Sequence, residues 1–155
     1  MAFGALSVKG RALRYLAQRE HSRLELERKL APHVADLPDA PAQAQIAAAL
    51  DELTARGLLS EQRVADSVLS SQGQRFGSRR LKQTLQAKGL PAEMVAQTLQ
   101  QARGTELERA REVWQRRFGR PAADATERAR QMRFLAGRGF DGDVIRRVVK
   151  ATDED

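Results

Sequence analysis

The sequence contains no cysteine and only 5% aromatic residues, and both scarcities narrow the possible functions. Without cysteine, neither a disulfide framework nor a thiolate metal site can form. The two histidines, His21 and His33, lie 12 positions apart at the two ends of one expected helix. We therefore expect surface or capping roles for them rather than metal ligation. Trp114 and Phe118 share a helical face with Ala110, and we expect them, like Tyr15, to be core residues rather than a base-stacking platform.

Long apolar runs are also absent. The first twenty residues, MAFGALSVKGRALRYLAQRE, are interrupted by Lys9, Arg11 and Arg14 before any run reaches the length of a signal peptide or membrane span. The sequence therefore predicts a soluble, cytoplasmic protein without a membrane segment.

The residue patterns of catalysis are missing as well. No serine sits in a nucleophile elbow, no Walker lysine follows a glycine loop, and the acidic residues do not form a convincing acid–base pair. One stretch, GRGFDG at residues 137–142, does fit the dinucleotide-binding pattern G-x-G-x-x-G. However, a polar helical segment precedes it in place of a strand, and only 13 residues follow Gly142, too few for a βαβ unit. We therefore expect no enzyme, no metal and no cofactor.

Positive charge is what the chain has in excess. The net charge is +7, with +1 in residues 1–59, +3 in 60–102 and +6 in 103–150, whereas the last five residues carry −3. Of the 27 basic residues 22 are arginine, whose planar guanidinium binds phosphate and carboxylate in bidentate fashion. The imbalance predicts an anionic partner. The open alternative is solvated helix faces carrying i,i+4 ion pairs, for which the candidates are Glu25 with Lys29, Glu112 with Arg116 and Asp143 with Arg147.

Helical spacing recurs along the chain, whereas no segment alternates apolar and polar residues over the length of a strand. Helix starts are marked by two candidate capping boxes, Ser22 with Glu25 and Thr105 with Glu108. The expected single caps are Ser60, Ser78 and Asp124, and Pro41 and Pro91 suit first-turn positions.

The helices repeat as a group. When LAGRGFDGDVIRRVV, residues 135–149, is shifted by 50 positions it falls on LQAKGLPAEMVAQTL, residues 85–99. A fainter copy includes Leu30, Ile46 and Leu50, with APHVADLPDAPAQ in place of the glycine turn. Each copy follows two helices with residue pairs four apart. The first helix has an alanine and a large apolar residue: Ala12/Leu16, Ala65/Leu69 and Ala110/Trp114. The second has Leu26/Leu30, Leu81/Leu85 and, as a weaker match, Gln131/Leu135.

These repeats predict an all-α fold of nine short helices in three units, at residues 1–59, 60–102 and 103–150, followed by an acidic tail at 151–155. One such unit has too little core to be stable alone, so consecutive units should stack into an elongated, curved array. Because the seam can be satisfied within one chain, we expect a monomer.

The comparison of residues 135–149 with residues 85–99 also indicates which glycine of GRGFDG has a structural role. Gly139 falls on Gly89, whereas Gly137 falls on Ala87 and Gly142 on Ala92. Only the middle glycine recurs, just after a helix, which predicts a left-handed C-terminal cap with Phe140 or Leu90 packing back on that helix.

These segments together resemble the RecX family of bacterial recombination regulators. The resemblance runs from about Ala12 to Val149 and is carried by ALRYLAQREHSRLELERKL, LDELTARGLLSEQRVADSVL, FGSRRLKQTLQAKGLPAEMV and FLAGRGFDGDVIRRVV. Two positions depart from the family pattern: Val64 stands where an aromatic is usual, and Gln131 where an apolar residue is expected.

The resemblance implies a protein without catalytic residues or cofactor that lodges in the groove of the RecA–DNA filament and inhibits filament extension, ATP turnover and strand exchange. From the charge pattern we expect contacts with RecA or DNA, single- or double-stranded, at these basic residues: Arg75, Arg79, Arg80, Lys82, Lys88, Arg116, Arg117, Arg120, Arg128 and Arg133. The alternative is a helical DNA-binding protein that acts without RecA.

Overall fold

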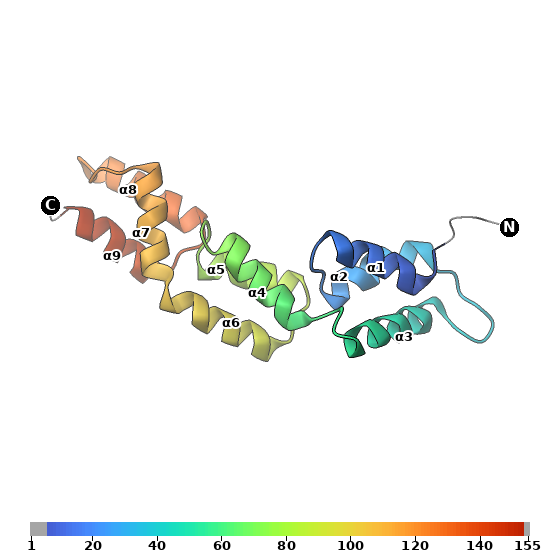
Figure 1. The fold of residues 1–155 in the computed structure, drawn as a ribbon. Helices are drawn as coiled ribbons and strands as arrows, with labels where there is room; N and C mark the ends of the chain where they lie inside the picture. Colours follow the sequence, from blue (N-terminus) through green and yellow to red (C-terminus); the bar gives the residue numbers. More distant parts are fainter. Residues whose placement is uncertain (1–5, 154–155) are drawn as a thin grey trace. The chain divides into compact units, whose positions relative to one another are not determined.

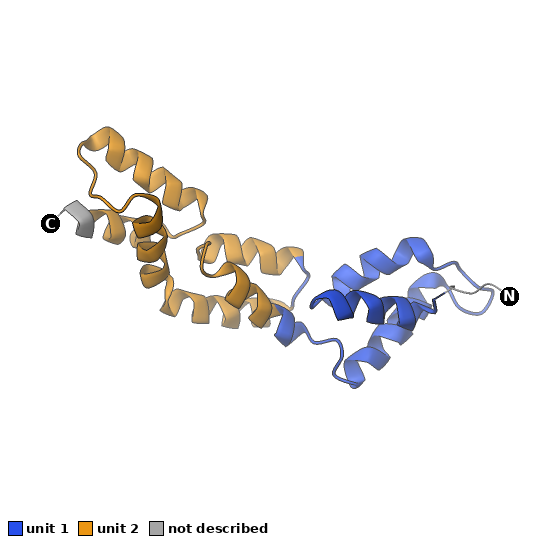
Figure 2. Ribbon diagram, turned by 45° about the horizontal axis from the view of Figure 1, so that its top comes forward, with its two compact units in different colours: residues 1–64, 88–90 blue, residues 65–87, 91–155 orange. Residues whose placement is uncertain are grey.

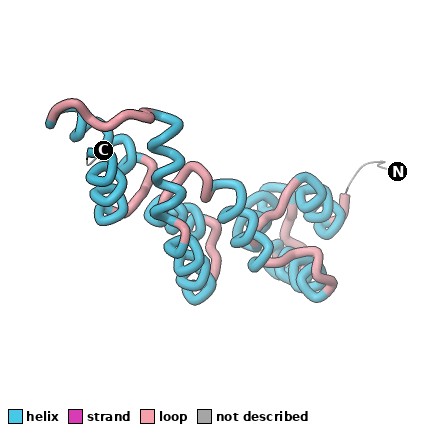
Figure 3. Tube along the Cα trace, turned by 60° about the vertical axis from the view of Figure 1, so that its left-hand side comes forward, coloured by secondary structure: helices cyan, strands magenta, loops and turns pink. Residues whose placement is uncertain are grey.

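A computed structural model describes residues 6–153 of the chain as helices joined by short loops (Figures 1 and 3). Within this range lie nine α-helices and one short 3-10 helix, so the predicted all-α class is confirmed. The helices are α1 (Val8–Gln18), α2 (Arg23–Leu30), η1 (Ala31–His33), α3 (Ala42–Ala55), α4 (Glu61–Gln72), α5 (Ser78–Ala87), α6 (Ala92–Gly104), α7 (Glu106–Arg117), α8 (Ala125–Gly137) and α9 (Gly142–Asp153). The predicted acidic tail, residues 151–155, lies outside the residues whose side chains are described.

The chain divides into two compact units, coloured separately in Figure 2. Unit 1 contains α1, α2, α3, the first turn of α4 and residues 88–90, and unit 2 contains the rest of α4 and all of α5 to α9. The helix order agrees with a group of three helices written three times, whereas the domain limits expected from the sequence remain predictions.

Unit 1 has a core of leucine and alanine contributed by the first three helices. Ala12 of α1, Leu26 and Leu30 of α2, and Leu50 and Leu53 of α3 are completely buried. These residues recur every three or four positions, as an amphipathic helix requires. The alanine and leucine pairs identified by the repeat therefore mark the buried faces.

The start of α2 is fixed twice, once by its own residues and once by distant ones. Ser22 and Glu25 form the predicted capping box. The next backbone N–H, that of Arg23, donates 2.8 Å to the carboxylate of Glu61, the first residue of α4. Glu25 also receives the ammonium of Lys88 at 3.0 Å. Long-range acceptors thus satisfy donors that a helix start otherwise leaves to water.

In unit 2, the start of α5 is likewise capped by a distant glutamate. The Ser78 N–H donates 2.8 Å to the carboxylate of Glu106, which is the first residue of α7 and only 2% exposed. Two further backbone bonds join the same helix start to the turn between α8 and α9: Gly77 N–H to the Arg138 carbonyl (2.8 Å) and Arg79 N–H to the Gly139 carbonyl (3.0 Å). A glutamate at the head of one helix therefore caps an earlier helix in both units.

Around this joint, unit 2 has an apolar core that includes Ala110 and Trp114 of α7, Leu135 of α8, and Phe140. Trp114 is buried as predicted, and its indole N–H donates 2.9 Å to the Gln131 side chain, whose amide donates 3.1 Å to the Arg120 carbonyl. Gln131 is 1% exposed. The polar residue at this expected apolar position therefore gives the buried Trp114 N–H an acceptor that leucine could not supply.

The glycine prediction is confirmed. Gly89 and Gly139 have φ of +72° and +87°, in the left-handed region. After α8, Gly139 N–H donates to the Ala136 carbonyl (3.0 Å) and Phe140 N–H to the Leu135 carbonyl (3.3 Å), which is a Schellman motif. The GRGFDG stretch is consequently a helix end.

Several local predictions were wrong. Thr105 makes no side-chain cap bond, and its hydroxyl donates to the Ala102 carbonyl instead. Ser78 lies inside α5, where its buried hydroxyl has no hydrogen-bond partner. His21 is fully buried rather than exposed.

Two expected helix-face pairs also differ. Glu25 pairs with Arg19 and Lys88 while Lys29 contacts His21, and Asp143 pairs with Arg146. The predicted caps at Ser60 and Asp124 are present, and Pro41 and Pro91 each stand one residue before their helix. Over the described residues, no helix combines the length and apolar character needed to cross a membrane.

Candidate functional site

Arginines gather over phenylalanine rings on the surface of unit 2. The guanidinium carbons of Arg80, Arg75 and Arg138 lie 4.3, 5.3 and 5.8 Å from the centre of the Phe76 ring. Arg138 also lies 5.0 Å from the centre of Phe134 and Arg117 lies 5.4 Å from it. A guanidinium at these distances is attracted to the negative face of the ring, and the contact holds the planar group in place.

Next to these rings is an open hollow of about 290 Å³. Its lining consists of four arginines and two apolar residues: Arg75, Arg116, Arg117, Arg138, Val113 and Phe134. None of these six side chains is acidic. The arginine–phenylalanine cluster, by which we mean Arg75, Arg80, Arg116, Arg117 and Arg138 with Phe76 and Phe134, therefore presents a positive surface on an apolar floor.

The cluster is positioned by a half-buried arginine, Arg109, that holds the loop between α4 and α5. Arg109 of α7 donates to the carbonyls of Gly73 (2.6 Å) and Phe76 (2.7 Å) in that loop, and to the Ala102 carbonyl (2.7 Å). Burial lowers the pKa of Arg109 from its usual value. Arg116 donates 3.1 Å to the Gln74 carbonyl in the same loop. The loop that carries Arg75 and Phe76 is thus held by α7, while the end of α8 supplies Arg138.

The structure brings four of the predicted contact residues together and leaves the others elsewhere. Arg75, Arg80, Arg116 and Arg117 belong to the cluster. Arg79 pairs with Asp141 at 3.2 Å, and Lys88 pairs with Glu25 in unit 1. Lys82 is exposed on α5, Arg120 lies in the loop before α8, and Arg128 and Arg133 are exposed on α8 itself.

Sequence reasoning missed Arg138 and the phenylalanines. The repeat aligned Arg138 with Lys88 only as a basic residue near a helix end. Phe76 and Phe134 stand alone in the sequence, and the fold brings their two rings beside four arginines. No local signal distinguishes such residues from ordinary core phenylalanines.

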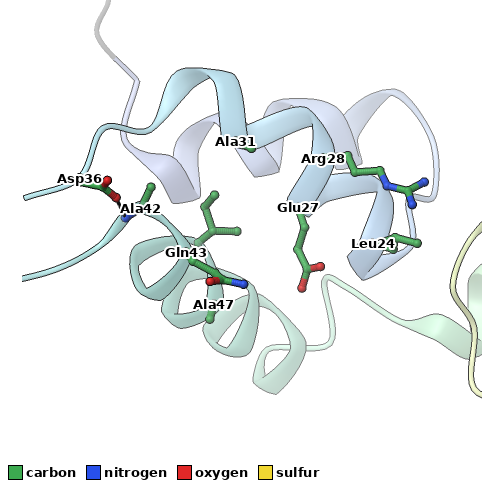
Figure 4. Close-up of a pocket in the computed structure, with 9 residues that line it drawn as sticks. Leu24, Glu27, Arg28, Ala31, Asp36, Ala42, Gln43 and Ala47 are labelled. Atoms are coloured by element: carbon green, nitrogen blue, oxygen red, sulfur yellow. Dashed lines mark hydrogen bonds between the residues drawn. The ribbon is translucent and has the colours of Figure 1, made fainter.

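Two further hollows are larger. One of about 550 Å³ in unit 1 is lined by α2, α3 and the connection between them, including Leu24, Glu27, Ala31 and Ile46 (Figure 4). It lies where the first copy has a long connection in place of the glycine turn. The other, of about 370 Å³, is lined by α8 and α9. Neither combines several arginines with aromatic rings, so the arginine–phenylalanine cluster is the stronger candidate.

Among the described residues, no group of three or more histidines and carboxylates is arranged to hold a metal ion. His21 is instead enclosed by hydrogen bonds, with Nδ1 donating to the Arg19 carbonyl at 3.0 Å and Nε2 accepting from the Lys29 ammonium at 2.9 Å. The Tyr15 ring lies against both, its centre 5.8 Å from that of His21 and 5.0 Å from Lys29 Nζ. Burial, together with the charges of Arg19 and Lys29, lowers the pKa of this imidazole. Its role is therefore structural.

Comparison with known proteins identifies the family. Residues 60–99 match the family model of the RecX second three-helix domain, and residues 105–149 match that of the third. The regulatory protein RecX of Leptothrix cholodnii is 55% identical over 150 residues, covering 97% of this chain and 92% of that protein. The regulatory protein RecX of Ralstonia nicotianae is 44% identical over 148 residues, covering 96% and 89%.

The fold is also similar to that of a solved RecX structure. The crystal structure of RecX from Lactobacillus salivarius superposes with a TM-score of 0.77 at 20% identity, covering 96% of each chain. At that identity the superposition shows the fold, and the closer relatives above carry the assignment. On these matches, which extend over nearly the whole chain, the protein belongs to the RecX family of regulatory proteins.

Proposed function

We propose that this protein restrains the RecA recombinase by binding in the groove of the RecA–DNA filament. The observation that supports this proposal most directly is family membership over nearly the full chain, with 55% identity to a regulatory protein RecX. The arginine–phenylalanine cluster supports the proposal because a filament groove that contains DNA is an anionic surface.

The proposed action is binding without catalysis. By bridging neighbouring RecA protomers the protein hinders filament extension, ATP turnover and strand exchange. It acts as a cytoplasmic monomer without cofactor, with three-helix domains at residues 1–59, 60–102 and 103–150. Regulation by occupancy requires no reacting residue, only a surface that fits the filament better than competing surfaces.

The test is to mix the purified protein with RecA, ATP and single-stranded DNA. At a protein concentration stoichiometric with RecA, we expect ATP hydrolysis and strand exchange to fall. If both rates are unchanged at saturation, the proposal is wrong.

The arginine cluster by itself also favours a second candidate, a helical DNA-binding protein that acts without RecA. This candidate predicts DNA binding whose affinity falls steeply with salt, because each neutralised phosphate releases condensed counterions. It predicts no change in RecA activity beyond that caused by occupying the DNA.

A charge-reversed variant separates the two candidates. Reversal of Arg79 and Arg80 is a poor choice, since Arg79 pairs with Asp141 and Arg80 packs against Gly139 and Phe76. Arg75→Glu with Arg117→Glu changes the charge of the hollow without breaking that joint. If this variant loses DNA binding yet still inhibits RecA, the RecA protein surface is the target. If inhibition and DNA binding are lost in parallel, the second candidate is favoured.

A further inference from the structure

The arginine–phenylalanine cluster carries more positive charge than the fold requires for its own stability. Four arginines line one hollow, and none of the residues lining it is acidic. Like charges in close proximity repel each other, so a fold built for stability alone would intersperse carboxylates. Such an exception to ordinary surface design is expected where a ligand supplies the missing charge.

We propose that this hollow is a phosphate-binding site, and that the phosphates it takes are those of a nucleic-acid strand. The inference rests on the proposed function in one respect: it assigns the DNA of the filament, rather than RecA, to this part of the surface. The site combines residues from the α4–α5 loop, α7 and the end of α8, all within unit 2.

Phosphate fits this site better than carboxylate does. A guanidinium donates two parallel N–H bonds to an oxyanion. A carboxylate has two oxygens and is saturated by one or two such forks. A phosphodiester chain instead offers a succession of charged groups that can engage arginines from several directions. Four arginines from three segments around one hollow match the second arrangement.

The rings give the arginines a fixed orientation. Phe76 and Phe134 together hold Arg75, Arg80, Arg117 and Arg138 at 4.3–5.8 Å from a ring centre. An arginine that is held before the ligand arrives loses less conformational freedom on binding. Since guanidinium groups cover them, these rings serve as supports and not as stacking partners for bases.

The GRGFDG stretch contributes to this site through its arginine. Arg138 is the second residue of the motif, and its side chain lies over both rings. Gly139 ends the helix, and the Arg138 carbonyl accepts from Gly77 N–H. This places the arginine against the loop that carries Phe76.

The experiment compares two triple variants with equal loss of charge. Arg75→Gln, Arg117→Gln and Arg138→Gln together empty the hollow of three guanidinium groups. The matched control is Arg103→Gln, Arg111→Gln and Arg147→Gln, which removes three exposed arginines of unit 2 that do not line the hollow. Circular dichroism and thermal unfolding establish that both variants are folded.

Binding of the full-length protein to a fluorescent oligodeoxythymidylate is then measured by anisotropy at several KCl concentrations. For the hollow variant we expect the slope of log K against log salt to shrink by about 2, which is three contacts at about 0.7 each for a single strand. For the control we expect a change of less than about 1. Equal changes in the two variants, or no binding by the wild-type protein, would overturn the proposal.

Two competitors distinguish the source of the anion. Tripolyphosphate supplies free phosphate, and polyglutamate supplies carboxylates on a polypeptide. We expect a second, unlabelled oligonucleotide to displace the probe at a lower concentration of charge than either competitor. If tripolyphosphate is the stronger competitor, the site takes free phosphate and not a strand, and if polyglutamate is stronger the site takes an acidic polypeptide. Either result contradicts the assignment to nucleic acid.

The same variants in the RecA ATPase assay keep the two proposals separate. A hollow variant that loses DNA affinity but still inhibits RecA supports this inference and places the RecA contact elsewhere. A wild-type protein without effect on RecA contradicts the proposed function, while the anisotropy slopes still decide the phosphate site.

Discussion

Three glycines of GRGFDG and its repeat, namely Gly139, Gly137 and Gly89, should respond differently when each is replaced by alanine. Gly139 has φ of +87°, and a Cβ added there would lie 2.5 Å from Arg80 Cβ and 2.6 Å from Arg80 N. Gly137 is the last residue of α8, and a Cβ added there would meet no atom within 4 Å. The two positions are two residues apart in sequence, but only at Gly139 do the backbone conformation and the neighbouring atoms exclude a larger side chain.

The magnitudes follow from these surroundings. At Gly139, alanine costs about 1–2 kcal/mol for the left-handed conformation. Displacing the Arg80 backbone adds about 1–3 kcal/mol, so Gly139→Ala should destabilise by about 2–5 kcal/mol. At Gly137, alanine reduces the entropy of the unfolded chain and should stabilise by about 0.5–1 kcal/mol.

Gly89→Ala should fall between these two values. Its φ of +72° carries the same conformational cost, but its Cβ would meet only side-chain atoms, Leu24 Cδ2 at 2.7 Å and Leu24 Cβ at 2.9 Å, whereas the contacts at Gly139 include the Arg80 backbone. We therefore expect a loss of about 1–3 kcal/mol.

Urea unfolding followed by circular dichroism measures all three variants, with thermal unfolding as a second readout at about 2–4 °C per kcal/mol. The expected order of stability is Gly137→Ala above wild type, then Gly89→Ala, then Gly139→Ala. A neutral Gly139→Ala, or a Gly137→Ala as unstable as Gly139→Ala, would refute the assignment of one structural glycine to the motif.

Three further predictions concern buried polar groups. Glu106→Ala leaves the Ser78 N–H without its acceptor and should destabilise by about 1–3 kcal/mol, whereas Glu106→Gln should retain most of the stability; equal losses in urea unfolding would contradict the cap. Bonds to Arg19, the Ser22 N–H and Lys88 lower the pKa of Glu25 to about 2. Glu25 therefore contributes stability that is present above pH of about 4.5 and lost as the pH falls toward 2. Glu25→Gln should remove that dependence. Burial lowers the pKa of His21, so this residue contributes stability that is present above pH of about 6.5 and lost as the pH falls through its lower folded-state value. The stability of His21→Gln, compared at pH 7.5 and 5.5, should therefore depend less on pH than that of the wild type. An unchanged pH dependence would exclude His21 as the source.

Much of the fold could be predicted because its signals are local. The spacing of Ala12, Leu26 and Leu30 marks buried helix faces, and Ser22 with Glu25 marks a helix start that needs no other element. The recurrence of one glycine fifty residues apart was enough to predict a left-handed helix end. Apart from that recurrence, these inferences depend on residues within about one helical turn of one another.

What could not be predicted depends on the tertiary fold. Ser78 is a good N-cap by composition, but its helix is capped by Glu106, 28 positions later. His21 is a surface residue by default, yet Lys29 and the Arg19 carbonyl satisfy it in the core. The local pattern offers a donor or acceptor, and the tertiary fold decides which partner it finds.

The candidate site illustrates the same limit. The charge gradient points to the arginines of the C-terminal half, but it could not separate Arg117, which lies over a ring, from Arg79, which pairs with Asp141. Arg138 was missed because its value comes from Phe76, 62 positions away. Periodicity identifies faces of helices, whereas a site assembled from a loop, a helix and a turn requires the fold.

The central claim is that the protein binds the RecA–DNA filament in preference to DNA alone. The direct measurement is binding of fluorescently labelled protein to RecA filaments preassembled on single-stranded DNA with a non-hydrolysable ATP analogue, compared with the same DNA without RecA at the same salt concentration. We predict saturable binding that is at least about tenfold tighter for the filament, a difference of about 1.4 kcal/mol. Equal affinity for filament and bare DNA would contradict the claim.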